Sequence, residues 1–136
     1  MGCIIVGFDG SDCARAALDT AADAAAALGD DLVVVYAYQV SRLGGEVSDY
    51  ATALDERAHE VMAHAQHQAD AKGVAVEEVV TEEAPAVALL RIADERDARM
   101  IVVGTRGESP LKGALVGAVP HKLLQLADRP VLVVPA

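Results

Sequence analysis

Short apolar runs of strand length alternate with longer amphipathic stretches along the whole chain. Five runs have the length and apolar content of strands, at 3–8, 32–38, 74–81, 100–103 and 130–134. Four stretches between them carry alanine, leucine and valine at helical spacing, at 11–28, 49–72, 85–97 and 118–127. Strands that alternate with helices form a parallel sheet with helices on both faces, because each crossover is right-handed and packs its helix on the sheet. The pattern therefore predicts a three-layer α/β/α fold.

The predicted boundaries carry their own signals. Ser11 can accept a hydrogen bond at a helix start, and Gly29 and Gly73 are typical of helix ends. Pro85 suits the first turn of a helix, because its missing N–H has no helical partner there. Since neither a linker nor an internal repeat interrupts this order, we expect one domain over residues 1–136.

Composition limits the class of protein. Of 136 residues, 53% are apolar, which is enough for one compact core and excludes wholesale disorder. The longest apolar runs are far shorter than the ~20 residues that cross a bilayer, so we expect no membrane segment. Asp9 interrupts the first apolar run, which argues against a secretory signal and favours a cytoplasmic location. Cys3 and Cys13 are too few for a disulfide framework and are expected to pack in the core.

Charge and aromatic content argue against nucleic acid as a partner. The formal net charge is −10, and the chain has three tyrosines, one phenylalanine and no tryptophan. It therefore offers neither a basic face for phosphates nor a row of rings on which bases could stack. The four histidines lack the spacing of a metal site and are expected on solvated helix faces. Only the last third of the chain is net basic, through Arg106, Lys112, Lys122 and Arg129.

Two glycine-containing turns mark a candidate ligand site. In an open parallel sheet, ligands bind beyond the carboxyl ends of the strands, where successive connections diverge to opposite faces. If the first and fourth strands are neighbours, the turns at 7–11 and 104–107 meet at that point. Both turns are built of small residues, which allow the backbone to approach a ligand closely.

The second turn continues as Gly104-x2-Gly107-x9-Gly117, and a predicted helix begins directly after Gly117. Backbone N–H groups of such a turn, the N-terminus of the helix and the nearby charge of Arg106 together suit a phosphate group. From spacing alone, the alternative is an ordinary loop followed by a helix start.

Four segments of the chain resemble the universal stress protein family. They lie in the family's order and at its distances, and they are Val6-Gly7-Phe8-Asp9-Gly10-Ser11, Ile101-Val102-Val103-Gly104-Thr105-Arg106-Gly107, Gly117-Ala118-Val119 and Arg129-Pro130-Val131-Leu132-Val133-Val134. The resemblance implies a five-stranded parallel sheet of order 3-2-1-4-5, a Rossmann-like fold similar to that of the adenine nucleotide alpha-hydrolases. It also implies an adenine-nucleotide-binding sensor or regulator of the stress response.

The resemblance assigns roles to residues in these segments. Gly7 and Asp9 would face the ribose and the adenine edge, and the backbone of Ala37 would contact adenine. Phosphates would be held mainly by backbone N–H groups, at Gly104, Arg106, Gly107, Gly117, Ala118 and Val119. From the residues alone, Asp9 has a second interpretation, as a turn residue beside Ser11.

One position departs from the family's pattern. Nucleotide-binding members carry Ser or Thr after the last glycine, where this chain has Ala118. The lost side-chain hydrogen bond is worth about 0.5 to 1.5 kcal/mol, so binding of terminal phosphates is weakened and not abolished. Pro120 removes one further N–H from the helix start. The resemblance implies ATP, with Mg²⁺, as the ligand, and AMP or cyclic AMP as the alternatives, since some relatives bind cyclic AMP and its single phosphate has less need of the lost hydroxyl.

Two other functions compete with a nucleotide-binding regulator. A nucleotide-free dimeric scaffold is favoured by Ala118, whereas the intact glycines of the motif argue against it. Slow hydrolysis of ATP would need a nucleophile or a poised base, and no matched position supplies one. For the nucleotide-binding regulator and for the scaffold alike, we expect a homodimer. The apolar strand Val131–Val134 should lie at a sheet edge between Pro130 and Pro135, where it can pair with its own copy.

Overall fold

The computed structural model describes residues 2–39, 47–106 and 117–136, with 47–52 described as backbone only. The strands in this part of the chain are β1 (Cys3–Gly7), β2 (Asp31–Tyr38), β3 (Val76–Glu82), β4 (Met100–Gly104) and β5 (Val131–Val134). The helices are α1 (Asp12–Leu28), α2 (Val47–Asp70), α3 (Pro85–Glu95) and α4 (Ala118–Leu126). All strands belong to one parallel sheet of order β3-β2-β1-β4-β5. The predicted sheet order is therefore confirmed.

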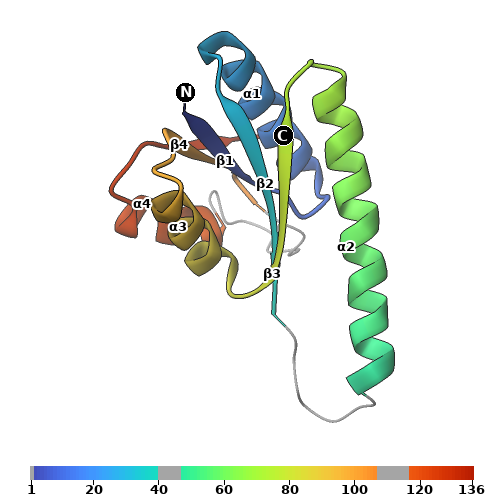
Figure 1. Ribbon diagram of the computed structural model, residues 1–136. Helices are drawn as coiled ribbons and strands as arrows, with labels where there is room; N and C mark the ends of the chain where they lie inside the picture. Colours follow the sequence, from blue (N-terminus) through green and yellow to red (C-terminus); the bar gives the residue numbers. More distant parts are fainter. Residues whose placement is uncertain (1, 40–46, 107–116) are drawn as a thin grey trace.

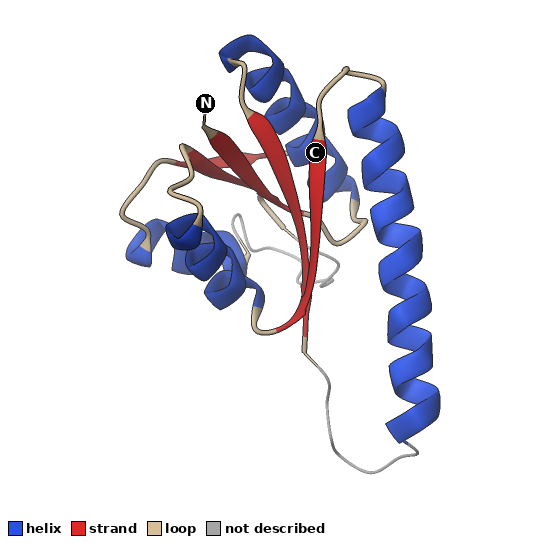
Figure 2. Cartoon of the chain, viewed as in Figure 1, coloured by secondary structure: helices blue, strands red, loops and turns tan. Residues whose placement is uncertain are grey.

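Helices cover both faces of the sheet (Figure 1; Figure 2). On one face, α1 and α2 pack over a core that includes Ile4 and Val6 of β1. On the other face, α3 and α4 pack over a core that includes Ile5 of β1 and Ile101 of β4. Successive residues of a strand point to opposite faces, which is why neighbours in β1 belong to different cores. The predicted three-layer α/β/α architecture is confirmed.

The predicted helix signals act where the sequence places them. The Ser11 hydroxyl accepts a hydrogen bond from the Ala14 N–H at 3.2 Å and caps α1. Gly29 ends α1 with φ of 70°, a left-handed conformation that glycine adopts without strain. The start of β3 differs from its prediction, because Val74 is buried but its N–H still bonds back to Ala69 of α2. No helix in the described residues is long and apolar enough to span a membrane.

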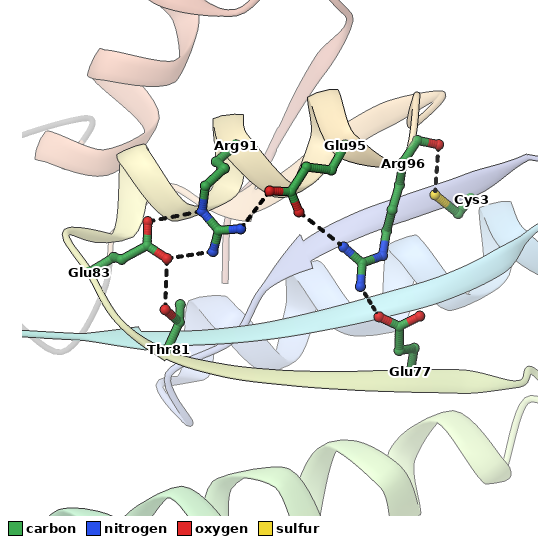
Figure 3. A network of polar contacts seen from close by, with 7 residues as sticks. All are labelled: Cys3, Glu77, Thr81, Glu83, Arg91, Glu95 and Arg96. Atoms are coloured by element: carbon green, nitrogen blue, oxygen red, sulfur yellow. Dashed lines mark hydrogen bonds and ion pairs between the residues drawn. The ribbon is translucent and has the colours of Figure 1, made fainter.

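A network of ion pairs fixes α3 against the edge strand β3 (Figure 3). Arg91 of α3 lies between Glu83 and Glu95, and Arg96 pairs with Glu77 of β3. Hydrogen bonds from Arg91 hold the pKa of Glu83 below its ordinary value. Because Glu83 stands just before α3, these contacts set where that helix begins at the carboxyl end of β3.

A buried carboxylate lies at the opposite end of the sheet, directly before β2 begins. The Asp30 side chain is only 1% exposed, and Arg99 donates to it from Nε at 2.5 Å and from Nη2 at 3.2 Å. The Gly2 N–H donates to the same carboxylate at 3.1 Å. The hydrogen bonds from Arg99 hold the pKa of Asp30 below its ordinary value, although burial acts in the opposite direction.

Acid is therefore expected to destabilise the fold through Asp30. An aspartate in an unfolded chain titrates near pH ~3.9, and the folded pKa of Asp30 lies lower. The Asp30–Arg99 pair thus stabilises the fold fully above the unfolded pKa, and this contribution is lost as the pH falls through the folded pKa.

Urea unfolding of Arg99→Gln should show a lower free energy of unfolding at neutral pH and a weaker loss of it below about pH 4. Arg15→Gln, which removes an exposed arginine near Asp12, is the matched control and should keep the acid dependence of the unchanged protein. An equally strong acid dependence in Arg99→Gln would contradict the assignment.

Candidate functional site

A crevice of about 280 Å³ opens at the carboxyl ends of β1, β2 and β4. It lies where α1 leaves β1 toward one face of the sheet while α4 follows β4 on the other. This divergence of connections is the place where open parallel sheets bind ligands. The lining residues are Gly7, Phe8, Asp9, Ala14, Val35, Tyr36, Ala37, Tyr38, Pro85, Leu89, Val103, Gly104, Arg106, Val119 and Pro120.

The crevice brings together most of the residues that the sequence singled out. Those that line it are Gly7, Asp9, Ala37, Gly104, Arg106 and Val119. Gly117 and Ala118 form the start of α4 beside the crevice and are not among its lining residues. Gly107 lies outside the described residues.

Gly104 has a packing role that its sequence pattern does not reveal. A Cβ atom at this position would lie 2.6 Å from Cys13 Cβ and 2.7 and 2.8 Å from the Cys13 backbone. Such distances are not sterically possible, so the first turn of α1 can approach β4 this closely only because residue 104 has no side chain. The missing side chain therefore lets the first turn of α1 pack directly against the end of β4.

Thr105 joins three elements next to the crevice. Its N–H donates to the Val134 carbonyl at the end of β5 at 3.0 Å, and its carbonyl accepts from the Gly117 N–H at 2.7 Å. Its hydroxyl lies 3.6 Å from Cys13 Sγ. This hydroxyl contact lowers the pKa of the Cys13 thiol, and burial opposes it. Thr105 therefore holds α1, β5 and the start of α4 in fixed positions around the β4 turn.

Asp9 contributes to the turn and also faces the crevice. Its Oδ1 accepts a hydrogen bond from the Ser11 N–H at 3.0 Å, which stabilises the turn between β1 and α1. The same residue lines the crevice and is partly exposed. Both interpretations of Asp9 from the sequence are thus compatible with its position.

The start of α4 presents backbone donors near Arg106. Gly117 is the N-cap and has no side chain to satisfy the first N–H groups of the helix. In the described part of the chain, no backbone carbonyl accepts from the N–H of Ala118 or Val119. The exposed Arg106 lines the crevice on the same side. An anion bound there would meet both N–H groups and the guanidinium.

Sequence reasoning missed the apolar wall of the crevice. Pro85 and Leu89 of α3 line the crevice together with Val35 and Val103 of the sheet. Leu89 reaches the end of β1, where a Cβ on Gly7 would lie 3.2 Å from its Cδ1. The helical spacing of α3 marked these residues only as core. The available signal was Pro85, which places the first turn of α3 at the carboxyl ends of the strands.

The lining of the crevice combines apolar side chains with groups that can bind an anion. The aliphatic wall suits a flat apolar ring, and the α4 start suits a phosphate. Among the described lining residues, no Ser, Cys or Lys stands beside a base that could activate it. In the same described set of side chains, no three His, Cys, Asp or Glu residues are arranged to share a metal ion.

Three comparisons relate the chain to known proteins. The model of the universal stress protein family matches residues 1–135. Universal stress protein YxiE of Bacillus subtilis (strain 168) is 34% identical over 143 residues, which cover 96% of this chain and 97% of that protein. A crystal structure of a universal stress protein in complex with cAMP is 32% identical, with a TM-score of 0.78 over 98% of this chain and 96% of that one. The universal stress protein from Archaeoglobus fulgidus in complex with dAMP is 26% identical, with a TM-score of 0.77 over 98% of both chains.

Proposed function

Since the chain belongs to the universal stress protein family, we propose that it binds an adenine nucleotide in the crevice between β1 and β4. The observation that carries the proposal is that an aliphatic wall lies in the same crevice as N–H groups at the start of α4 that no backbone carbonyl of the described residues accepts. The base would lie against Leu89 and Val103, and the phosphate would meet Val119 and Arg106. Binding of cAMP and dAMP by two similar proteins supports an adenine nucleotide as the ligand.

We propose that binding, and not turnover, is the function. A partner protein in a cytoplasmic stress response would recognise the nucleotide-bound form. Two free cysteines, Cys3 and Cys13, fit the reducing environment of that compartment. ATP with Mg²⁺ is included among the ligands to be tested.

Calorimetry with AMP, cyclic AMP, ADP and ATP tests the proposal. At a ligand concentration 100 times the dissociation constant, binding stabilises the fold by about 2.7 kcal/mol, so melting curves provide a second readout. Gains in melting temperature with at least one of the four nucleotides, and none with the matching guanine nucleotide, are expected. Absence of heat and of thermal stabilisation with all four at millimolar concentration would leave the nucleotide-free scaffold as the better function.

We further propose that two copies of the chain pair along β5. This strand ends the sheet, and its neighbour in the described residues is β4 alone. Val131 and Val133 pack against the core under α3 and α4, whereas Leu132 is 39% exposed. An apolar strand with a free edge favours pairing with its own copy, which closes the assembly.

Leu132→Lys is expected to convert the dimer to a monomer while the fold remains stable. The substitution places a charge in the proposed interface, and Leu132 is the β5 side chain most exposed to solvent. Sedimentation equilibrium at micromolar concentration measures the mass. Val87→Lys, at a 55% exposed position on α3, is the matched control and should leave the mass unchanged. A monomer before substitution, or a dimer unaffected by Leu132→Lys, would refute pairing along β5.

A further inference from the structure

Strand β3 forms an open edge of the sheet, beside α2 (Figure 1). In the described part of the chain it pairs with β2 alone, in register from Val76 to Glu82. It has seven residues, whereas β5 at the other edge has four. The outer backbone groups of an edge strand can accept a further strand from another chain. β3 is long enough for a peptide to pair with it along several residues.

The register of β3 determines which of its backbone groups face outward. The Leu32 N–H of β2 donates to the carbonyl of Ala75, just before β3, at 3.1 Å. In a parallel pair, every second residue of a strand bonds to the same neighbour with both of its backbone groups, so the residues two and four positions after Ala75 also bond to β2. The residues between them direct both backbone groups to the open edge, and they are Val76, Glu78, Val80 and Glu82. No backbone group of the other described residues occupies these outward positions.

The outward residues of β3 carry their side chains on the face of the sheet that α2 covers. Val76 packs against the core under α1 and α2, and side chains alternate along a strand, so Glu78 and Val80 lie on the same face. Val80 is nevertheless 44% exposed. The helix therefore leaves an apolar side chain uncovered at this edge.

A groove of about 470 Å³ lies between β3 and α2. Glu78 lines it from the strand, and the residues that line it from the helix include Met62, His67 and Asp70. A strand added to β3 would direct every second side chain toward the face on which this groove lies.

Two acidic side chains flank Val80 on this face. Glu78 and Glu82 are both exposed, and neither forms an ion pair with a described arginine or lysine. On the opposite face, by contrast, Glu77 pairs with Arg96. The edge thus presents an acidic, an apolar and an acidic side chain at alternate positions. Because directly opposite side chains of paired strands interact, the complementary sequence is basic, apolar and basic at the same spacing.

The same charges argue against a second copy of this chain at β3. Two copies paired antiparallel about Val80 would place Glu78 of each copy opposite Glu82 of the other. Like charges in directly opposite positions are destabilising. The occupant that fits this edge is therefore a chain of a different sequence.

We infer that β3 docks an extended segment of a partner protein, which adds an antiparallel strand to the sheet and carries Lys or Arg at alternate positions on both sides of an apolar residue. The formal net charge of −10 attracts a basic segment at long range. The inference is independent of the proposed nucleotide site, because none of the described residues that line the crevice belongs to β3.

Labelled synthetic peptides test this docking edge directly. The probe has the length of β3, with lysine, valine and lysine at alternate central positions and threonine elsewhere, and fluorescence anisotropy measures its binding to the full chain. We expect it to bind about 10-fold more tightly than a peptide of the same composition whose lysines are adjacent, because only alternation places a lysine opposite each glutamate. Equal binding of the two peptides would show attraction by charge alone and would overturn the inference.

Methylation of the peptide backbone tests the strand pairing itself. In an antiparallel pair, the residues opposite the outward positions of β3 exchange N–H···O bonds with them. Methyl groups on the amide nitrogens of the valine and the two lysines should reduce binding about 10-fold, because several hydrogen bonds are lost. Methyl groups on the threonines between them, whose amides face away from β3, should have much less effect. Equal affinity of the two methylated peptides would refute addition to the sheet.

Reversal of charge on the protein provides an independent test. Glu78→Lys combined with Glu82→Lys should weaken the basic peptide about 10-fold and strengthen a matching peptide with glutamate in place of lysine. Glu56→Lys combined with Glu60→Lys makes the same change of net charge at exposed positions of α2 outside the lining of the groove, and is the matched control. If the control variant changes both affinities as much, the peptides respond to net charge and do not dock at β3.

A proline at residue 80 removes one outward N–H and leaves the hydrogen bonds to β2 in place, as proline does on edge strands. Val80→Pro should therefore bind the basic peptide severalfold more weakly than Val80→Thr, which keeps the N–H. Melting curves show whether both variants fold, and the methylated peptides carry the same test if the proline variant does not. Equal peptide affinity in the two folded variants would overturn the inference. A smaller mass of Val80→Pro in sedimentation equilibrium would also overturn it, because a second copy of the chain would then occupy the edge.

Discussion

Replacing Gly104 by alanine is expected to lower the free energy of unfolding by about 3 kcal/mol, at the upper end of the usual cost of overpacking. The new methyl group would stand 2.6 Å from Cys13 Cβ and within 2.8 Å of the Cys13 backbone. Relief would require α1 to move away from β4, and these two elements share the most extensive helix–strand contact among the described residues. A loss of this size lowers the melting temperature by roughly 10 °C for a chain of this length.

A second substitution tests which atoms of Cys13 cause the loss of stability in Gly104→Ala. The clash involves Cβ and backbone atoms of Cys13, all of which remain in Cys13→Ala. Adding Cys13→Ala to Gly104→Ala should therefore restore little of the lost free energy of unfolding. Urea unfolding without nucleotide measures this, so that ligand contacts play no part. Full stability of Gly104→Ala would show that α1 and β4 do not approach as closely as described.

Much of the fold could be predicted because each element carries a local signal. The apolar run before Asp9, the cap at Ser11 and the left-handed Gly29 act within a few residues of one another, so spacing alone reveals them. The start of β3 was predicted two residues early, because Val74 is apolar and buried but continues the turn from α2. Burial and strand pairing are separate properties, and an apolar pattern reports only the first.

The site was predictable only where the crevice is built from the turns themselves. Asp9 and Arg106 follow strand ends, and the topology then brings them together. Leu89 was not predictable as a lining residue, since its spacing in α3 is that of any core leucine. The engagement of the Gly117 N–H by Thr105 was equally hidden, because it depends on a hydrogen bond across twelve positions of the chain.

Exposure also decides which residue tests the dimer. A charge at Val133 would also lie on the strand along which pairing is proposed. In the structure, however, Val133 packs against the core under α3 and α4 and would disturb the monomer as well. Leu132 is 39% exposed, so that its substitution tests pairing with less effect on folding. The alternation of a strand is visible in the sequence, but the face that lies under a helix is not.

Gly117→Val is expected to reduce nucleotide affinity at least 100-fold, about 2.7 kcal/mol, with a much smaller effect on stability than Gly104→Ala. Gly117 has φ of −73° and ψ of 176°, which any residue adopts, so the backbone itself tolerates a side chain. A Cβ there lies 3.3 Å from the Thr105 carbonyl oxygen and 3.5 Å from Arg106 Cα. Alanine needs a shift of a few tenths of an ångström, whereas the two methyl groups of valine would separate the β4 turn from α4.

That separation moves Arg106 away from the N–H groups of Ala118 and Val119, on which the proposed phosphate contact depends. Calorimetry with AMP should therefore show a graded loss from glycine to alanine to valine, while adenosine, which lacks the phosphate, loses much less. Melting curves of the three proteins without ligand provide the control for folding. If Gly117→Val binds AMP with unchanged affinity, the phosphate does not lie at the start of α4, because a valine at residue 117 cannot be accommodated there without widening the gap between the two turns.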